Sequence, residues 1–155
     1  MKVAIGGTFD SLHDGHKKLL KKVFELSEGG EIAIGVTSDT MARASRDRVV
    51  LPYKARAENI RRYMYEEYGV KVRTVELNDR YGVTLDEYFD YIVISPETYT
   101  VALKINELRE ERGKPPIKIV KVEHMKAADG KAISSTRIKA GEIDEHGSLL
   151  AYNEK

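Results

Sequence analysis

The sequence contains no cysteine among its 155 residues, and neither sign of charge dominates, with 26 lysines and arginines against 25 acidic residues. The absence of cysteine excludes disulfide bonds, zinc sites built on thiolates and thiol nucleophiles. A formal net charge of +1 gives no overall field that would hold a polyanion such as DNA, although a small anionic ligand needs only local positive charge. We therefore expect no nucleic-acid partner.

Long apolar runs are also missing. No stretch approaches the roughly 18 apolar residues that a membrane-spanning helix needs, and the run at residues 3–5 ends at Gly6, which is too short for a secretory signal. Hydrophobic residues nevertheless make up 41% of the chain, enough for one continuous core at this length. We therefore predict a single domain spanning residues 1–155, located in the cytoplasm and without a membrane partner.

Strand-like and helix-like segments alternate along the chain without a repeat or long linker. Apolar or β-branched runs predict strands at residues 2–5, 32–36, 70–77, 91–94 and 117–122. Helical patterns lie at residues 19–24, 52–69 and 95–108, and a short helix is expected after Ser135. This alternation predicts an α/β, Rossmann-like fold in which a five-stranded parallel sheet has helices on both faces. Ligands bind such sheets beyond the carboxyl ends of the strands, so the loops there are expected to carry the function.

The loop after the first predicted strand reads Gly-Gly-Thr-Phe-Asp-Ser-Leu-His-Asp-Gly-His over residues 6–16. Its glycines allow the backbone to turn sharply and to approach a ligand. The helix expected to begin near Gly15 directs unpaired N–H groups and its positive dipole end at the loop, which favours an anion. His13 and His16 are three residues apart, so they share a helix face and can each donate a hydrogen bond to a phosphate. Gly15 between them is expected to keep the space above this turn free for a ligand.

Other interpretations of this loop remain open. The glycines also fit a simple turn, and the histidines also fit surface positions. A metal site made by Asp10, His13 and His16 is a weaker alternative, because their spacing is not that of H-E-x-x-H. The loop matches neither a P-loop nor the G-x-G-x-x-G pattern of dinucleotide-binding folds.

A second candidate anion site lies near the C-terminus, where residues 133–138 read Ile-Ser-Ser-Thr-Arg-Ile. Three consecutive hydroxyl residues are expected to open a short helix that Ser134 or Ser135 caps, leaving N–H groups and the Arg137 guanidinium for a phosphate. An ordinary capped helix with a solvated arginine is the alternative.

Both segments resemble the signatures of the nucleotidyltransferase superfamily that carries the H-x-G-H motif, and they lie at opposite ends of the chain. The resemblance implies that His16 stabilises the transition state at the α-phosphate, that His13 also binds nucleotide phosphates, and that Thr8 helps to position the attacking group. The second signature then binds the β- and γ-phosphates. The residues implied for ATP binding are Gly7, Thr8, Phe9, Asp10, His13, Gly15, His16, Ser134, Ser135, Thr136 and Arg137.

Within that superfamily the chain resembles the archaeal and eukaryotic type of phosphopantetheine adenylyltransferase, at residues 37–39, 52–56, 95–98, 102–106 and 109–113. Cytidylyltransferases usually carry Arg-Thr-x-Gly before the isoleucine of the second signature, whereas residues 128–132 read Ala-Asp-Gly-Lys-Ala. The resemblance implies adenylyl transfer from ATP to 4′-phosphopantetheine in coenzyme A biosynthesis, giving dephospho-CoA and pyrophosphate. Mg²⁺ would come with ATP, without a protein ligand. An FMN adenylyltransferase, a CTP-dependent cytidylyltransferase and a non-catalytic nucleotide-binding regulator remain alternatives.

The sequence departs from the bacterial type where the acceptor phosphate is bound. That type uses a lysine after the second strand and arginines after the fourth, but here Ser-Pro-Glu-Thr follows Ile94. The candidate acceptor-binding residues are Thr8, Asp10, Arg46, Lys54 and Glu97, with Arg43 and Arg48 as further cations in the segment after the second strand. Each charged candidate is equally explained as a solvated loop residue. Nothing in the sequence indicates the oligomeric state.

Overall fold

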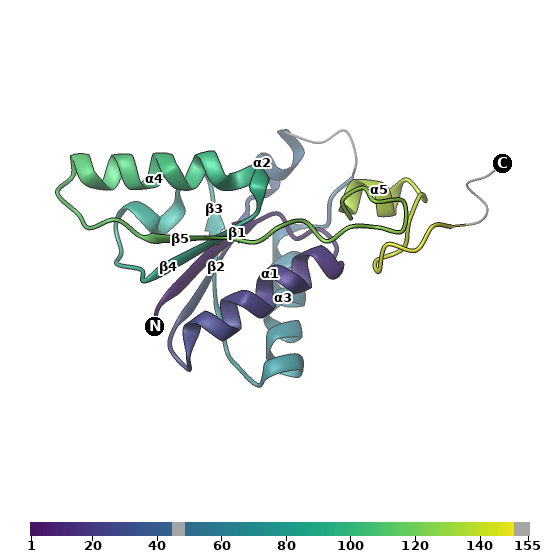
Figure 1. The fold of residues 1–155 in the computed structure, drawn as a ribbon, viewed down its shortest axis with the longest axis horizontal. Coiled ribbons are helices and arrows are strands. Elements are labelled where there is room, and N and C mark those ends of the chain that lie inside the picture. The colour runs from purple at the N-terminus through teal and green to yellow at the C-terminus, as the bar shows by residue number, and fades with distance from the viewer. Residues whose placement is uncertain (45–48, 151–155) are drawn as a thin grey trace.

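In the computed structural model, which describes residues 1–44 and 49–150, the chain forms a five-stranded parallel sheet (Figure 1). Its strands are β1 (Val3–Gly7), β2 (Ile32–Thr37), β3 (Arg73–Leu77), β4 (Tyr91–Ile94) and β5 (Lys118–Lys121). Their order across the sheet is β3-β2-β1-β4-β5. The order reverses beside β1, because the chain first proceeds to β2 and β3 and then returns to place β4 on the other side. This switch point is where α/β sheets bind ligands.

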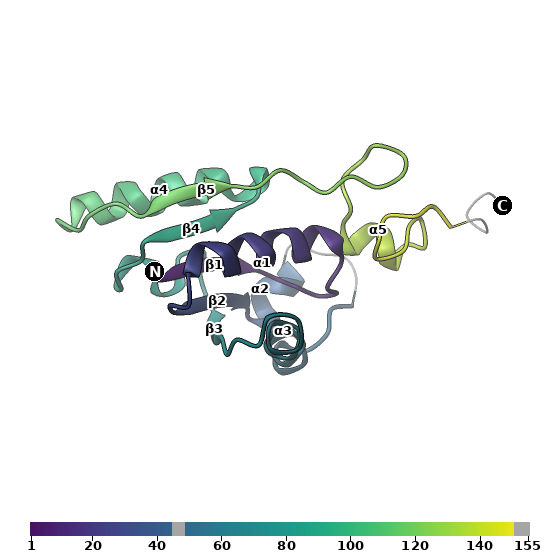
Figure 2. The same cartoon turned by 60° about the horizontal axis from the view of Figure 1, so that its bottom comes forward.

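Helices cover both faces of the sheet, as predicted. Helices α1 (Asp14–Ser27) and α3 (Tyr53–Tyr68) lie on one face, while α4 (Tyr99–Glu111) and the 3₁₀ helix η1 (Gly82–Leu85) lie on the other (Figures 1 and 2). The shorter helices are α2 (Asp39–Ala44), η2 (Pro96–Thr98) and α5 (Ser135–Lys139). None of the helices within the described ranges is both long and apolar enough to cross a membrane.

The two faces of β1 and β2 carry side chains of different size. Ile5 and Ile34 are among the large side chains that join the core under α1 and α3. On the opposite face, Ala4 and Ala33 face η1 and α4, because successive side chains of a strand alternate between faces. The larger side chains fill one layer, while the small ones leave room between the sheet and α4.

Helix α3 illustrates how local signals set the bounds of an element. Pro52 occupies its N-cap and Gly69 its C-cap, where a φ of 68° places the glycine in the left-handed region. Both positions agree with the prediction, since proline tolerates a helix start and glycine a left-handed end. Helix α1 ends at Ser27, and Glu28 at its C-cap adopts the left-handed conformation with φ 48°.

Helices α2 and η1 were not predicted. They have only six and four residues, too few for a hydrophobic period to be recognised. Local hydrogen bonds hold α2 instead, since the Ser38 hydroxyl accepts the N–H of Met41 at 3.2 Å.

The segment after β5 returns to the beginning of α1. A small apolar cluster of Ala127, Ile133 and Ile143 supports it. Glu145 accepts the backbone N–H of Asp14 at 2.9 Å, and the hydroxyl of Ser11 donates to that of Ser135 at 3.0 Å. These contacts place α5 beside the N-terminus of α1 (Figure 2).

Candidate active site

A cavity of about 590 Å³ opens at the carboxyl edge of the sheet, and both motifs line it. The first motif contributes Gly7, Thr8, Phe9, Asp10, His13, Gly15 and His16, and the second contributes Ser134, Ser135 and Thr136. Glu97 lines it as well, whereas Arg137 and Lys54 do not. Arg46 lies outside the described residues. The fold therefore brings together most of the residues that the two motifs predicted, although they come from opposite ends of the chain.

His13 and His16 form a reciprocal cap at the start of α1. The backbone N–H of His16 donates to Nδ1 of His13 at 3.3 Å, and the N–H of His13 donates to Nδ1 of His16 at 3.5 Å. Their rings stack with centroids 3.8 Å apart and planes 17° from parallel. Because each Nδ1 accepts a hydrogen bond, a neutral ring carries its proton on Nε2, where it can be donated to a ligand.

The electrostatics of His13 favour the neutral ring. The pKa of His13 is lowered from 6.5 to about 3, mainly by burial and to a smaller extent by the neighbouring His16. A charged imidazole loses its hydration on burial, so the uncharged form is preferred. His13 is therefore a neutral hydrogen-bond donor at neutral pH in the ligand-free site.

The glycines of the first motif make room for the protein's own rings. A β-carbon at Gly15 would lie 2.8 Å from the His13 ring, and one at Gly7 would lie 2.9 Å from the Phe9 ring. Phe9 is 3% exposed, adopts a φ of 51° and places its ring 5.1 Å from that of His16. The expectation that Gly15 frees space for a ligand needs correction, because the His13 ring fills that space. ATP binding by Gly15 stays a prediction.

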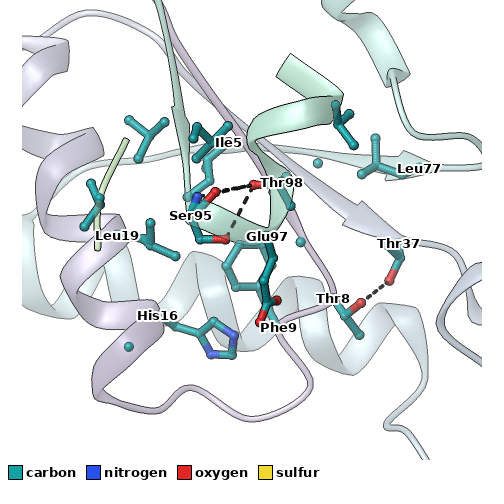
Figure 3. Close-up of a pocket in the computed structure, with 18 of the residues that line it drawn as sticks. Ile5, Thr8, Phe9, His16, Leu19, Thr37, Leu77, Ser95, Glu97 and Thr98 are labelled. Atoms are coloured by element: carbon teal, nitrogen blue, oxygen red, sulfur yellow. Dashed lines mark hydrogen bonds between the residues drawn. The ribbon is translucent and has the colours of Figure 1, made fainter. Parts of the chain in front are cut away.

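Thr8 is oriented by a chain of hydrogen bonds that begins at a buried arginine. Arg56 is fully buried and donates from Nη1 to the hydroxyl of Thr37 at 3.2 Å. Thr37 in turn donates to the hydroxyl of Thr8 at 3.0 Å (Figure 3). Because Thr8 Oγ1 accepts in this chain, its own proton can be directed at a ligand in the cavity. The motif indicated Thr8 but not Thr37 or this role of Arg56. Two signals were available: both residues lie in segments that resemble the archaeal and eukaryotic enzyme, and Arg56 lies four residues before the buried Ile60.

Asp10 lies at the cavity but is engaged within the protein. Only 2% of it is exposed. Its carboxylate accepts the backbone N–H of Leu51 at 2.9 Å and pairs with Lys139 at 2.6 Å. Asp10 thus ties the first motif to α5 and to the start of α3. Direct binding of ATP or acceptor by Asp10 stays a prediction.

Helix α5 directs its hydroxyl groups and its arginine to different places. Ser134 caps it by accepting the N–H of Arg137 at 3.2 Å. The Arg137 guanidinium pairs instead with Asp129 and, at 3.1 Å, with Glu142. These carboxylates raise the pKa of Arg137, and Arg137 lowers the pKa of Asp129. The structure therefore uses Arg137 to hold the loop before α5, outside the cavity. Phosphate binding by Arg137 stays a prediction.

Glu97 contributes to the cavity from the loop after β4. Its carboxylate lies 3.6 Å from Nε2 of His124, which follows β5 and also lines the cavity. The Ser95 and Thr98 side chains form a capping box that holds this turn (Figure 3). His124 was missed from the sequence, and its position just after a predicted strand was the only signal. Acceptor binding by Glu97 stays a prediction.

No protein metal site is formed in the part of the chain that the structure describes. There, no three aspartate, glutamate or histidine side chains gather closely enough to hold an ion. Asp10, the acid nearest to the two histidines in the sequence, is already paired with Lys139. The donor set therefore does not fit a resident metal, and the arrival of Mg²⁺ with ATP stays a prediction.

Comparison with known proteins identifies the family. The family model described as cytidylyltransferase-like matches residues 4–141. A phosphopantetheine adenylyltransferase from Archaeoglobus fulgidus is 58% identical over 150 residues, which cover 97% of this chain and all of that protein. Another from Methanosarcina mazei is 50% identical, with 96% of each protein covered. A solved structure of a protein of unknown function from Archaeoglobus fulgidus is 56% identical and has a TM-score of 0.74, over 79% of this chain and 89% of that one. The chain therefore belongs to the phosphopantetheine adenylyltransferase family of cytidylyltransferase-like proteins, as its two motifs and the further segments that resemble this enzyme predicted.

Proposed function

We propose that this protein transfers the adenylyl group of ATP to 4′-phosphopantetheine, forming dephospho-CoA and pyrophosphate. The observation that carries the proposal is that both motifs line one shared cavity at the switch point of the sheet, to which the first contributes His13 and His16 and the second Ser134 and Ser135. Relatives that match nearly the whole chain bear the name of this enzyme.

The reaction requires little covalent chemistry from the protein. An oxygen of the acceptor phosphate attacks the α-phosphorus of ATP, and the bond between that phosphorus and the oxygen bridging to the β-phosphate breaks. A phosphate monoester has a second pKa near ~6, so the nucleophile is already ionised at neutral pH without a general base. Catalysis then consists of positioning the phosphates and stabilising the charge that develops between them.

In this proposal, His16 donates from Nε2 to an oxygen of the α-phosphate as charge accumulates there. Its orientation is fixed before the substrate arrives, because Nδ1 is bonded to the His13 backbone and the ring stacks on that of His13. A preorganised donor stabilises a transition state without reorganisation at the moment of reaction. His13 donates to the nucleotide phosphates in the same way. Mg²⁺ bound to ATP supplies further neutralisation of phosphate charge.

The hydroxyl residues of α5 provide the second group of phosphate contacts in this proposal. Ser134, Ser135 and Thr136 line the cavity, and the bond between Ser11 and Ser135 holds them next to the first motif. The β- and γ-phosphates are assigned to these residues, so that pyrophosphate leaves toward α5.

The acceptor is assigned to the part of the cavity between the sheet and α4. The small residues Ala4 and Ala33 line its floor, and Val101, Ala102 and Ile105 of α4 line the other side. This space suits the slender pantetheine arm, because apolar walls bury its methylene and dimethyl groups. Thr8 lies where the floor meets the motif, so its hydroxyl is assigned to positioning the acceptor phosphate.

The proposal is tested by incubating the purified protein with Mg·ATP and 4′-phosphopantetheine, then measuring pyrophosphate release and dephospho-CoA by mass spectrometry. Parallel reactions contain CTP in place of ATP, or FMN in place of 4′-phosphopantetheine. We expect product from ATP with 4′-phosphopantetheine, and its loss in the His16→Ala variant. The assignment would be refuted if product formed only in the reaction with FMN or only in the reaction with CTP. It would also be refuted if no pair of substrates gave product.

A further inference from the structure

The cavity must accommodate one charged group that the motif residues do not neutralise. The acceptor phosphate approaches ATP, which is itself polyanionic, and the reaction brings these negative charges together. The pKa of His13 is too low for it to carry charge at neutral pH. His124 lies beside the Glu97 carboxylate. A further cation at the acceptor end of the cavity would offset this repulsion.

Arg80 is the candidate for this cation. Within residues 1–44 and 49–150, it is the only lysine or arginine that lines the cavity. It lies three residues after the end of β3, and β3 pairs with β2 so that Leu77 is the partner of Thr37. Thr37 bonds to the Thr8 hydroxyl. Arg80 therefore follows the edge strand β3, which neighbours the strand β2 that carries Thr37. This edge is the one away from β4 and β5.

The backbone around Arg80 is fixed by its neighbour. The Asp79 carboxylate accepts the N–H groups of Tyr81 and Gly82, both at 2.8 Å. Gly82 adopts a φ of 54°, which favours glycine. Asp79 therefore bonds to the backbone, and the loop presents Arg80 without neutralising it.

The Arg80 side chain is exposed, and no carboxylate pairs with it within the described ranges. Arg73 and Arg112 differ in this respect. Arg73 is held by Glu87 at 2.7 Å, and Arg112 lies 3.4 Å from Asp86. A guanidinium without an acidic partner keeps its hydrogen-bond donors for a ligand, and its planar fork matches phosphate oxygens.

We propose that Arg80 binds the phosphate of the acceptor and selects phosphorylated pantetheine over its unphosphorylated form. The inference rests on the proposed function and deepens it. The same loop continues into Tyr81, Val83 and Thr84, which line the cavity toward α4. One segment thus offers a cation for the phosphate and an apolar wall for the arm of the same molecule.

The test is steady-state kinetics of Arg80→Ala and Arg80→Lys, with each substrate varied at saturating concentration of the other. We expect Arg80→Ala to raise KM for 4′-phosphopantetheine by about 10- to 100-fold, the range of one charge-assisted hydrogen-bonded contact. KM for ATP should stay within about twofold of wild type, since ATP is assigned to α1 and α5. Arg80→Lys should fall between the two, because lysine keeps the charge but loses the fork.

Arg62→Ala serves as the matched control, because Arg62 is an exposed arginine of α3 that does not line the cavity. Its kinetics should equal those of wild type. Equilibrium titration gives a second measurement: wild type should bind 4′-phosphopantetheine more tightly than pantetheine, and Arg80→Ala should lose this preference. Thermal melting of each variant shows whether the fold is intact.

The outcomes separate the inference from the proposed function. An acceptor KM of Arg80→Ala within twofold of wild type would overturn the inference while leaving the function intact. The inference would also be overturned if Arg80→Ala raised KM equally for both substrates. The same holds if Arg46→Ala or Lys54→Ala, and not Arg80→Ala, raised KM for the acceptor alone. Absence of dephospho-CoA formation by the wild-type protein would refute the function and the inference together.

Discussion

Replacing Arg56 with alanine should destabilise the protein more than any comparable change on the surface of α3. The guanidinium is fully buried and connects segments that meet at the carboxyl edge of the sheet. It donates to the carbonyls of Leu51 at 2.7 Å and Thr8 at 3.0 Å, to the Thr37 hydroxyl at 3.2 Å and to the Asp39 carboxylate at 3.0 Å. Alanine would remove this donor from all four acceptors, of which the Asp39 carboxylate keeps the backbone N–H of Tyr53 at 2.8 Å.

The magnitude follows from the burial of these groups. Removing one partner of a buried ion pair costs about 3–5 kcal/mol, because the remaining groups stay buried without compensation. The Asp39 side chain is 41% exposed, so water can solvate that carboxylate after the substitution, which favours the lower end of the range. We therefore expect the free energy of unfolding to fall by about 3–4 kcal/mol. Against a typical total of about 5–15 kcal/mol, this is a large fraction.

Equilibrium unfolding in urea measures this loss, with Arg61→Ala as the control. Arg61 lies on the same helix, but its side chain is 42% exposed and its partner Glu58 is 55% exposed. An exposed pair of this kind contributes about 0–1 kcal/mol. A loss below about 1 kcal/mol for Arg56→Ala, or one equal to that of Arg61→Ala, would refute the reasoning from burial.

Other consequences of the geometry can be measured directly. His16→Ala should lower kcat by about 10²-fold or more while leaving the Kd for ATP close to wild type, as pyrophosphate release and calorimetry would show; a near-normal kcat would exclude the assigned role. Gly15→Ala should cost about 1–3 kcal/mol in urea unfolding, because the added methyl group overlaps the His13 ring. Lowering the pH from about 6.5 should destabilise the protein, because the unfolded state binds a proton at His13 that the folded state, with a pKa of about 3, does not. His13→Gln should remove this pH dependence above pH 4.5. Below that pH a further loss of stability is expected, because Glu87 becomes protonated in the unfolded state while Arg73 and Lys2 hold its pKa at about 2 in the folded state.

Much of the fold could be predicted because its signals are local. Apolar runs bounded by glycine and proline gave the five strands, and Pro52 and Gly69 gave the ends of α3. Helix α2 could not be found in this way, because six residues contain too little of a hydrophobic period. Its stability depends on the Ser38 cap and on Arg56, which approaches Asp39 from another helix.

The residues of the candidate site likewise fall into those that local sequence signals predicted and those that only the fold brings together. The two motifs could be recognised because their glycines, histidines and hydroxyl residues are contiguous in sequence. The acidic partners of Arg137 could not be recognised, because a motif does not show that Asp129 and Glu142 fold back onto it. Arg80 was missed for a related reason. An isolated arginine after a strand is unremarkable until the fold places it at a cavity.

The contacts between Ser11 and Ser135 and between Asp10 and Lys139 have a consequence for biosynthesis. A ribosome makes the histidine loop and all five strands before α5, so the sheet can begin to form before α5 has been made. The serine hydroxyl groups that complete the cavity join about 124 residues after the loop they contact. A partly translated chain lacking α5 would therefore have the histidines in place without the groups that face them, and nucleotide binding should begin only after α5 has been made.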